Sequence, residues 1–495
     1  MKKPTINTLG ALKKTDYRSR TVKEELRENL ISILKSKDPT FFSSIKGFED
    51  TVIPQLQSAI LSKHNILFLG LRGQAKTKMA RLMAELLDEW IPAIEGSELQ
   101  DDPLNPVSHY GKTLIEERGD NTPIDWIHKS ARYSEKLATP DVSVADLVGD
   151  IDPIKAANMK LSFGDERVIH FGMIPKANRG IFVINELPDL QARIQVSLFN
   201  MLQEKDIQIR GFKLRFDLDV QFVFTANPED YTNRGSIITP LKDRIESQIL
   251  THYPKTIELS KEITLQEAQL PEAQESLLNI HPLVHDLLEQ TGIEARESDF
   301  VDQKSGVSAR LTIAAYELIH SAAERRTLIN GEKKTVSRIS DLFSAIPAIT
   351  GKLELVYEGE LEGMSNVAYF IISKAIRQQF ENYFPDPAKT KKGNINPYEP
   401  IVNWFNKGNN LEIPNDLSNE DYIERLSDVP GLLNIVDIYK KDIKKEYKPL
   451  FMEFVLHGLA EYSQLSKHSL EKSIQFKDMI SGLDFEMDFN EEDIK

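Results

Sequence analysis

Residues 70–77 combine a glycine, a lysine and a threonine at a spacing that could hold phosphate groups. The stretch "GLRGQAKT" matches the pattern G-x-x-x-x-G-K-[ST] except at its sixth position, where alanine replaces glycine. Backbone N–H groups in such a loop cradle phosphates, the lysine reaches the β- and γ-phosphates, and the hydroxyl binds Mg²⁺. The alternative is a chance match on a surface turn. The residues of the candidate loop are Gly70, Leu71, Arg72, Gly73, Gln74, Ala75, Lys76 and Thr77.

The alanine at position 75 is the departure that matters for this loop. If its φ is negative, alanine is tolerated easily. If its φ must be positive, alanine costs about 1–2 kcal/mol relative to a right-handed conformation.

Two polar residues follow an apolar run in "RGIFVINELPDL" (179–190). A strand that ends in two carboxylates normally holds the Mg²⁺ shell with the first and polarises the attacking water with the second. Asn185 stands in the first place, so it keeps a carbonyl oxygen for the metal shell but lacks the negative charge. Glu186 stands in the second place and is the candidate catalytic base. The alternative is a strand with an ordinary polar exit.

Three more polar residues stand where nucleotide hydrolysis could use them. Asn227 follows the apolar run 220–226 and could orient water beside a γ-phosphate, although Asn-Pro is also a common turn. Arg244 could act on a neighbouring molecule's nucleotide, where such an arginine can be worth 10³–10⁵ in rate. Arg310 begins a predicted helix and could be a second sensor. The alternative for both arginines is a surface charge, but five features in the right order make chance a poor explanation.

Short apolar runs and amphipathic stretches alternate around these residues. The runs "NILFLG", "GIFVIN" and "VQFVFTA" are apolar on both faces, as buried parallel strands are. We therefore expect an α/β fold with a parallel sheet, followed by helices. A helix after the candidate loop would carry one apolar stripe of Met79, Leu82, Met83, Leu86, Leu87 and Trp90.

The same patterns predict four parts. These are a helical lead-in (1–45), a nucleotide-binding core (46–254), a helical lid (255–349) and a mostly helical C-terminal extension (350–495). The lid should contain a helix whose apolar face is formed by Leu311, Ala314, Ala315, Leu318, Ile319 and Ala322.

Composition excludes several classes of function. A net charge of −15 over 495 residues argues against broad contact with nucleic acid. The absence of cysteine excludes disulfides, thiolate zinc sites and cysteine nucleophiles. No apolar run approaches the roughly 20 residues of a membrane span. The basic N-terminus lacks the apolar segment of a signal peptide, so we expect a cytoplasmic protein without membrane insertion.

At residues 45–330 the sequence resembles the AAA+ ATPases of the magnesium chelatase I-subunit and MoxR branch. The last 150 or so residues resemble longer chelatase-like bacterial ATPases. The resemblance is carried by "GLRGQAKTK", "GDIDPIKA" (149–156), "FGMIPKANRGIFVINELPDL" (171–190), "IRGFKLRF" (209–216), "TANPEDYTNRG" (225–235) and "ITPLKDRI" (238–245).

The resemblance implies an AAA+ core with a helical lid that binds ATP and Mg²⁺ and assembles into a ring, with a hexamer as the expected form. It also implies a hairpin at 209–216 and an inserted element around 144–156 that faces the ring pore or a partner. Partners in this branch carry a von Willebrand A domain with a D-x-S-x-S metal site. "DVSVA" (141–145) and "DLSNE" (416–420) both lack the last serine, so the partner would be a separate polypeptide.

Three functions compete. The first is an Mg²⁺-dependent ATPase that remodels a partner or loads metal into it. The second is a nucleotide-dependent switch or scaffold with little turnover, which Asn185 favours and Glu186 and Arg244 oppose. The third is a transcriptional activator of the enhancer-binding type, which would need a G-A-F-T-G-A-like loop and a DNA-binding helix pair, and neither is evident in the sequence.

Overall fold

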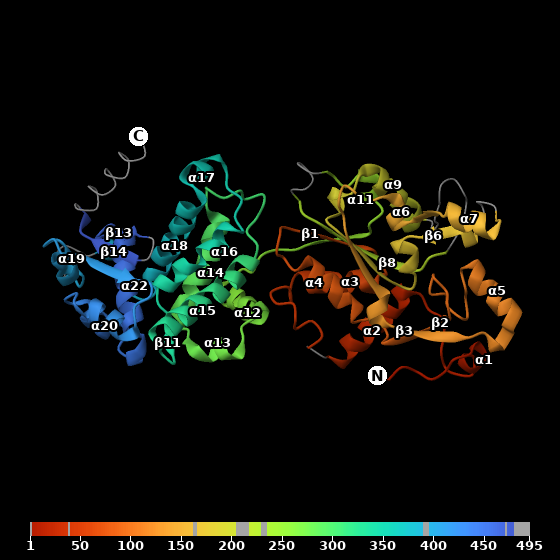
Figure 1. Ribbon diagram of the computed structural model, residues 1–495, viewed down its shortest axis with the longest axis horizontal. Coiled ribbons are helices and arrows are strands. Elements are labelled where there is room, and N and C mark those ends of the chain that lie inside the picture. The colour runs from red at the N-terminus through yellow and green to blue at the C-terminus, as the bar shows by residue number, and fades with distance from the viewer. Residues whose placement is uncertain are drawn as a thin grey trace. The chain divides into compact units, whose positions relative to one another are not determined.

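Two compact units make up the chain, Met1–Tyr253 and Pro254–Lys495 (Figure 1). The first is built around a parallel β-sheet, and the second is mostly helical. The predicted division into four parts is finer than this and stays a prediction. The computed structural model describes residues 2–37, 40–161, 166–203, 217–228, 235–389, 396–470 and 473–479.

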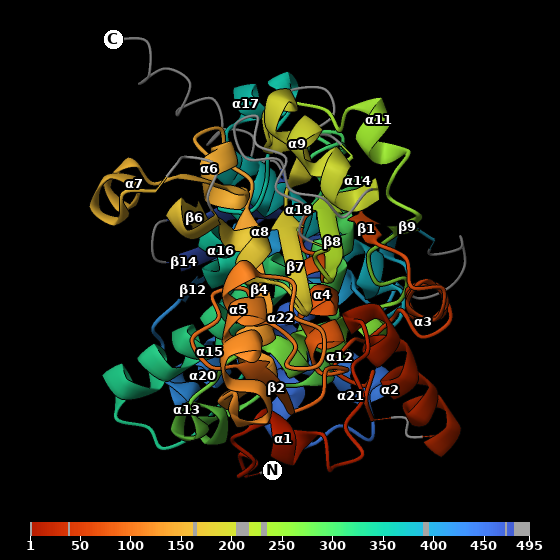
Figure 2. The same ribbon diagram turned by 90° about the vertical axis from the view of Figure 1, so that its right-hand side faces the viewer.

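The central sheet of the first unit has five parallel strands in the order β4-β7-β8-β1-β9 (Figure 2). The three predicted strands are confirmed and form its centre. The two outer strands carry several polar residues, and the apolar pattern did not predict them. The strands are β4 (Tyr133–Leu137), β7 (Gly180–Asn185), β8 (Val220–Ala226), β1 (Ile66–Leu69) and β9 (Ser247–Leu250).

Both faces of this sheet are covered, because successive side chains of a strand point to opposite sides. Ile66 and Phe68 of β1 pack into a core with α2 (Val22–Ser36), α3 (Val52–Leu61) and α4 (Lys76–Ala84). Leu67 and Leu69 pack into a second core on the other face, with α9 (Ala192–Gln203) and α11 (Thr239–Lys242). The fully apolar strand sequence follows from this double burial.

The N-terminal lead-in is packed into the first unit. After α1 (Leu9–Leu12), helix α2 begins with a capping box between Thr21 and Glu24. Glu25 of α2 forms a buried, two-pronged ion pair with Arg132, at 2.8 and 2.6 Å. The side chains of Glu25 and Arg132 are 4% and 1% exposed, so the lead-in helix is tied to the core by charge as well as by apolar packing.

The helix predicted after the phosphate loop is shorter than expected. Helix α4 stops at Ala84, and Trp90 instead begins β2 (Trp90–Ile94), which pairs with β3 (Ile124–His128). Leu86 and Leu87 are buried in the turn between them. Helical spacing of apolar residues therefore continued past the end of the helix, because the turn also points side chains into the core.

The predicted inserted element is a compact excursion between β4 and β7. It consists of α6 (Val144–Leu147), β5 (Gly149–Ile151), α7 (Pro153–Met159), β6 (Ile169–Phe171) and α8 (Met173–Lys176), with β5 and β6 antiparallel. The predicted hairpin at 209–216 lies outside the described residues.

The second unit has one apolar core that draws residues from both sides of position 349. Its helix α15 (Arg310–Asn330) buries Leu311, Ala315 and Ile319 as predicted, with Ala314 and Leu318 packed against the same core. A small antiparallel sheet of β12 (Leu411–Pro414), β14 (Ser473–Lys477) and β13 (Ser466–Ser469) was not predicted.

The other helices of the second unit connect these elements. They are α12 (Ile257–Glu267), α13 (Glu272–Leu277), α14 (Pro282–Glu297), α16 (Ile346–Thr350), α17 (Tyr357–Glu362), α18 (Met364–Phe380), α19 (Glu399–Phe405), α20 (Asn419–Ser427), α21 (Leu432–Tyr439) and α22 (Lys448–Glu461). Across the described ranges of both units, no helix is both long enough and apolar enough to cross a membrane.

Candidate nucleotide-binding site

The candidate phosphate loop connects the end of β1 to the first residue of α4, as its sequence pattern predicts. Ala75 caps the helix with φ +54° and ψ +17°, in the left-handed region. This conformation is the one that glycine adopts without strain, so alanine carries a cost of about 1–2 kcal/mol here.

Gly70 is required by close packing at the start of the loop. A Cβ atom at this position would lie 1.9 Å from the hydroxyl of Thr251 and 2.3 Å from the side-chain oxygen of Gln74. The Thr251 hydroxyl donates a hydrogen bond to that same oxygen, at 2.7 Å. The hydroxyl of Tyr253 donates to the carbonyl of Arg72, at 2.9 Å. Residues 251–253, just after β9, therefore hold two points of the loop.

Lys76 lies at the start of α4 with its side chain buried. Its ammonium group donates hydrogen bonds to the carbonyl oxygens of Gly70 and Leu71, the second at 3.0 Å. The ammonium charge thus lies inside the curve of the loop, where the N-terminus of α4 also directs its N–H groups. A helix N-terminus and a lysine in one concave loop favour a phosphate.

Thr77 and Asn185 meet beside the loop, although they lie far apart in the sequence. The Thr77 hydroxyl donates to the Oδ1 atom of Asn185 at 3.3 Å. This donation uses the hydroxyl proton and leaves oxygen lone pairs, which are what a hard divalent cation needs. Mg²⁺ at nucleotide sites usually has only one or two protein ligands in addition to phosphates and water. Within the described residues there is no cluster of three or more His, Asp or Glu side chains that could hold a metal alone.

Glu186 follows β7 directly and has φ +55° and ψ +52°. A non-glycine residue in this region costs on the order of 1–3 kcal/mol and is held there by its surroundings. Its backbone N–H donates to the hydroxyl of Thr225, at 3.1 Å. Glu186 therefore lies on the turn that follows β7, at the same end of the sheet as the phosphate loop.

Asn227 follows β8 and lies next to the loop, because Gly70 N–H donates to the carbonyl of Ala226 at 3.2 Å. Its side chain is buried. Among the described residues its Oδ1 atom has no hydrogen-bond partner. A buried amide oxygen of this kind favours a polar ligand or an ordered water beside it. The residues present therefore fit a phosphate group with a hydrated cation.

Arg244 lies at the other end of the sheet. It precedes β9 by three residues, and the first residue of β9 pairs with Ile66, the first residue of β1. The phosphate loop follows the last residue of β1. Arg244 is half-buried, donates to the carbonyl of Pro240 at 2.7 Å, and stacks its guanidinium over the ring of Phe199. It is therefore separated from its own loop by the length of the central strands.

Arg310 begins α15 in the second unit, and its side chain is exposed. The structure brings together the loop, Asn185, Glu186 and Asn227 within the first unit, and the assignment of Arg310 stays a prediction.

Two threonines of this site were not predicted from the sequence. Thr225 lies within the apolar run 220–226, one residue before its end, and Thr251 directly follows β9. Only these positions at strand ends could have suggested them.

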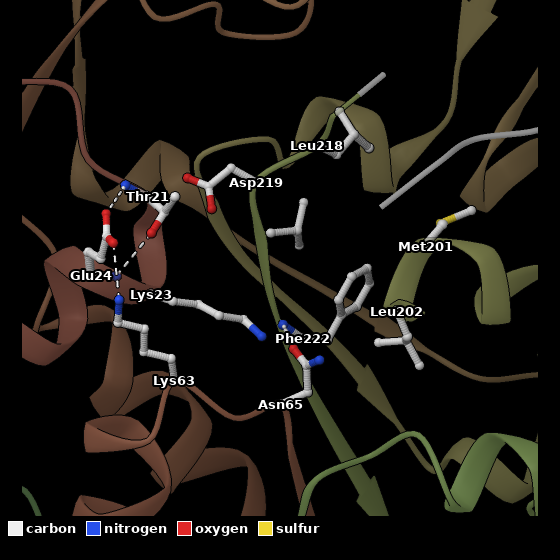
Figure 3. Close-up of a pocket in the computed structure, with 11 residues that line it drawn as sticks. Thr21, Lys23, Glu24, Lys63, Asn65, Met201, Leu202, Leu218, Asp219 and Phe222 are labelled. Carbon is white, nitrogen blue, oxygen red and sulfur yellow. Dashed lines mark hydrogen bonds and ion pairs between the residues drawn. The ribbon is translucent and has the colours of Figure 1, made fainter. Parts of the chain in front are cut away.

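The described part of the chain also contains a pocket of about 230 Å³ away from these residues (Figure 3). Asn65 and Val220 in its wall lie at the start of β1 and β8, whereas the loop and Asn227 follow the ends of these strands. The pocket is therefore separate from the candidate site. It is lined by Thr21, Lys23, Glu24, Lys63, Asn65, Met201, Leu202, Leu218, Asp219, Val220 and Phe222.

A family model described as the Sigma-54 interaction domain matches residues 158–249. The matched range is well under half of the chain. It includes Asn185, Glu186, Asn227 and Arg244, but it begins after the phosphate loop. A search of curated proteins found none that matches this chain.

Solved structures of other proteins also resemble the chain, and three of them are of NtrX, magnesium chelatase and Hsp104. NtrX from Brucella abortus is 14% identical, with 52% of this chain and 50% of that chain covered and a TM-score of 0.30. This chain thus spans about half the length of NtrX. A chain from a complex of subunits BchI and BchD of magnesium chelatase is 21% identical, with 65% of this chain and 98% of that chain covered and a TM-score of 0.33. Hsp104 with ATPγS and casein is 14% identical, with 67% of this chain and 52% of that chain covered and a TM-score of 0.37.

The strand order and the position of the loop define the class of fold. Strands β9-β1-β8-β7-β4 lie side by side, the candidate phosphate loop follows β1, and the polar residues follow β7 and β8. Together with the family match over β6 to β9, this arrangement is an AAA+ domain with a helical C-terminal part. The predicted fold class is confirmed.

Proposed function

We propose that this chain is an Mg²⁺-dependent ATPase. The observation that carries the proposal is the convergence of Lys76, Thr77, Asn185 and Asn227 at one end of the central sheet, with Glu186 on the adjoining turn. These residues come from three different strand ends, which is how an open parallel sheet assembles a ligand site.

In this proposal each residue has a separate role. The loop N–H groups and the Lys76 ammonium bind the phosphates, and Thr77 with Asn185 holds the cation and its water. Bound Mg²⁺ neutralises charge on the β- and γ-phosphates. Glu186 accepts a proton from the attacking water, and Asn227 orients that water with its amide. The roles of Leu71, Arg72, Gly73 and Gln74 are to present the loop backbone.

The finer class we propose is the magnesium chelatase I-subunit and MoxR type. The resemblance of the motifs at 70–78, 149–156 and 171–190 supports it, as does the excursion of α6 to α8, which lies between β4 and β7. On this proposal the chain forms a ring, with a hexamer as the expected number, and Arg244 completes a neighbour's site. The ring would act in the cytoplasm on a separate von Willebrand A domain protein, to remodel it or to load metal.

A second candidate is a nucleotide-dependent switch with little turnover. Two observations favour it, namely the amide at Asn185 in place of a carboxylate and the strained Ala75 in the loop. The Sigma-54 match does not lead us to a transcriptional activator, because the chain contains no G-A-F-T-G-A sequence.

Phosphate release from ATP and calorimetric titration with ATP test the proposal together. The unmodified protein should bind ATP and release phosphate only with Mg²⁺. Lys76→Ala should weaken ATP binding by at least about tenfold, because it removes the ammonium from the phosphates. Lys78→Ala is the matched control on the same helix and should leave ATP binding unchanged. Equal affinity in both variants would contradict the site, and binding without phosphate release would select the switch.

A further inference from the structure

The hydroxyl of Thr225 connects the two polar residues at the end of β7. Thr225 lies in β8 and is 1% exposed. Its oxygen accepts the N–H of Glu186 at 3.1 Å and lies 3.2 Å from the Oδ1 atom of Asn185. Among the described residues, this hydroxyl has no other side-chain hydrogen bond.

This geometry determines which way the Asn185 amide faces. The Thr225 oxygen already accepts one N–H, so its own proton needs an acceptor, and a buried hydroxyl proton without one is costly. The Asn185 oxygen is the acceptor at hand. If the amide were turned over, its NH₂ group would face Thr225, and the Thr225 proton would lose its partner.

The same amide oxygen also accepts from Thr77, at 3.3 Å. An amide turned over would present NH₂ protons to Thr77 and to any cation beside it. A carboxylate at position 185 would have no such problem, because its two oxygens are equivalent acceptors. The need to fix the orientation thus arises from the asparagine in this chain.

We propose that Thr225 is a positioning residue for the metal side of this site, which sets the Asn185 amide with its oxygen toward Thr77 and the cation. This inference rests on the proposed Mg²⁺-dependent binding of ATP. Thr225 itself touches neither nucleotide nor metal in this assignment, and it acts through Asn185 and through the Glu186 backbone.

Four chains test the assignment: the unmodified protein, Thr225→Val, Asn185→Asp and the double variant. Valine has nearly the shape of threonine and lacks only the hydroxyl, so the strand should still fold, which thermal unfolding checks. In the unmodified background we expect Thr225→Val to lower kcat by about tenfold, with a smaller rise in the KM for ATP. Thr225→Ser should restore most of kcat, because it restores the hydroxyl.

The readout specific to amide orientation is the comparison between backgrounds. Thr225→Val should cause a loss of kcat in each background. In chains that also carry Asn185→Asp, this loss should be at least about threefold smaller than in chains that keep Asn185. Equal losses in both backgrounds would overturn the assignment, because Thr225 would then act only through Glu186 or through the fold.

Calorimetry with ADP supplies a readout that does not depend on turnover. We expect Thr225→Val to leave ADP affinity without Mg²⁺ unchanged and to reduce the gain in affinity on adding Mg²⁺ by at least about threefold. An unchanged gain would overturn the assignment. If the unmodified protein shows this Mg²⁺ gain but releases no phosphate, then the proposed hydrolysis fails, and the calorimetric comparison alone decides the role of Thr225.

Discussion

The hydroxyl of Thr77 lies 3.3 Å from the amide oxygen of Asn185, although 108 positions separate the two residues in the chain. Thr77 is on the first turn of α4, and Asn185 is the last residue of β7. The contact joins the phosphate loop to the strand that supplies Glu186. It also shows that the asparagine keeps one function of the missing carboxylate, which is to accept the threonine proton.

Replacing Ala75 by glycine should stabilise the first unit. The left-handed φ of +54° costs alanine about 1–2 kcal/mol, and glycine loses about 0.4–1 kcal/mol through its freer unfolded chain. The free energy of unfolding should therefore rise by about 0.5–1 kcal/mol. Denaturant unfolding followed by tryptophan fluorescence measures this, since two of the three tryptophans, Trp90 and Trp126, lie in the first unit.

Ala84→Gly is the matched control for that substitution, at the last helical residue of the same helix. Glycine there should lower the free energy of unfolding by about 0.5–1 kcal/mol, because a right-handed helical alanine is unstrained. A loss of stability in both variants would contradict the strain assigned to Ala75.

Glu186→Gln should bind ATP normally and release phosphate at least about tenfold more slowly, which corresponds to about 1.4 kcal/mol of barrier. The amide keeps the size of the side chain but cannot accept the proton of the attacking water. Steady-state phosphate release and calorimetric titration measure the two properties separately.

Asp189 lies three residues beyond Glu186 and supplies the control, as Asp189→Asn. Turnover should persist in this variant. If Asp189→Asn stops phosphate release while Glu186→Gln does not, the catalytic base has been misassigned.

Arg244→Ala should leave ATP binding largely intact while phosphate release falls steeply. Arg244 lies at the end of the sheet away from its own loop, so a neighbour in a closed ring would present the γ-phosphate to it. Mixing this variant with Glu186→Gln should partly restore turnover, because some interfaces then pair an intact Glu186 with an intact Arg244. Co-purification of one variant with an affinity-tagged copy of the other checks that the two variants assemble together.

Arg244→Lys keeps the charge but not the planar fork of donors, so it should restore little turnover. Mixtures that assemble but show no rescue would count against action across a subunit boundary, as would full activity in a dilute monomer.

Glu25→Ala should destabilise the first unit by about 3–5 kcal/mol, because it leaves the Arg132 guanidinium buried without its carboxylate. Glu28→Ala is the control on the same helix. Glu28 pairs with Arg18 and Arg20 near the surface, where water screens the charges, so its loss should cost much less stability than the loss of Glu25. Similar losses in chemical unfolding would show that the lead-in helix does not depend on the buried pair.

The sequence determined the parts of this protein that depend on local pattern. The runs at 66–69, 180–185 and 220–226 are apolar on both faces because both faces are buried, and they became the central strands. The loop pattern at 70–77 placed a strand before it and a helix after it, and both are present. The edge strands β4 and β9 escaped prediction because their sequences mix polar and apolar residues. No residue of β4 is fully buried, and only Ile249 is fully buried in β9.

Tertiary structure decided what no local pattern carries. The backbone path of the folded loop sets the sign of φ at Ala75. Strands brought together from distant positions create the hydrogen bond from Thr77 to Asn185 and the one from the Thr225 hydroxyl to Asn185. Helical spacing likewise predicted a helix through Trp90, but the helix ends at Ala84. Leu86 and Leu87 are buried in the core although they lie in the turn after the helix. Apolar periodicity reports which side chains are buried, but the partners of polar side chains are fixed only when the chain has folded.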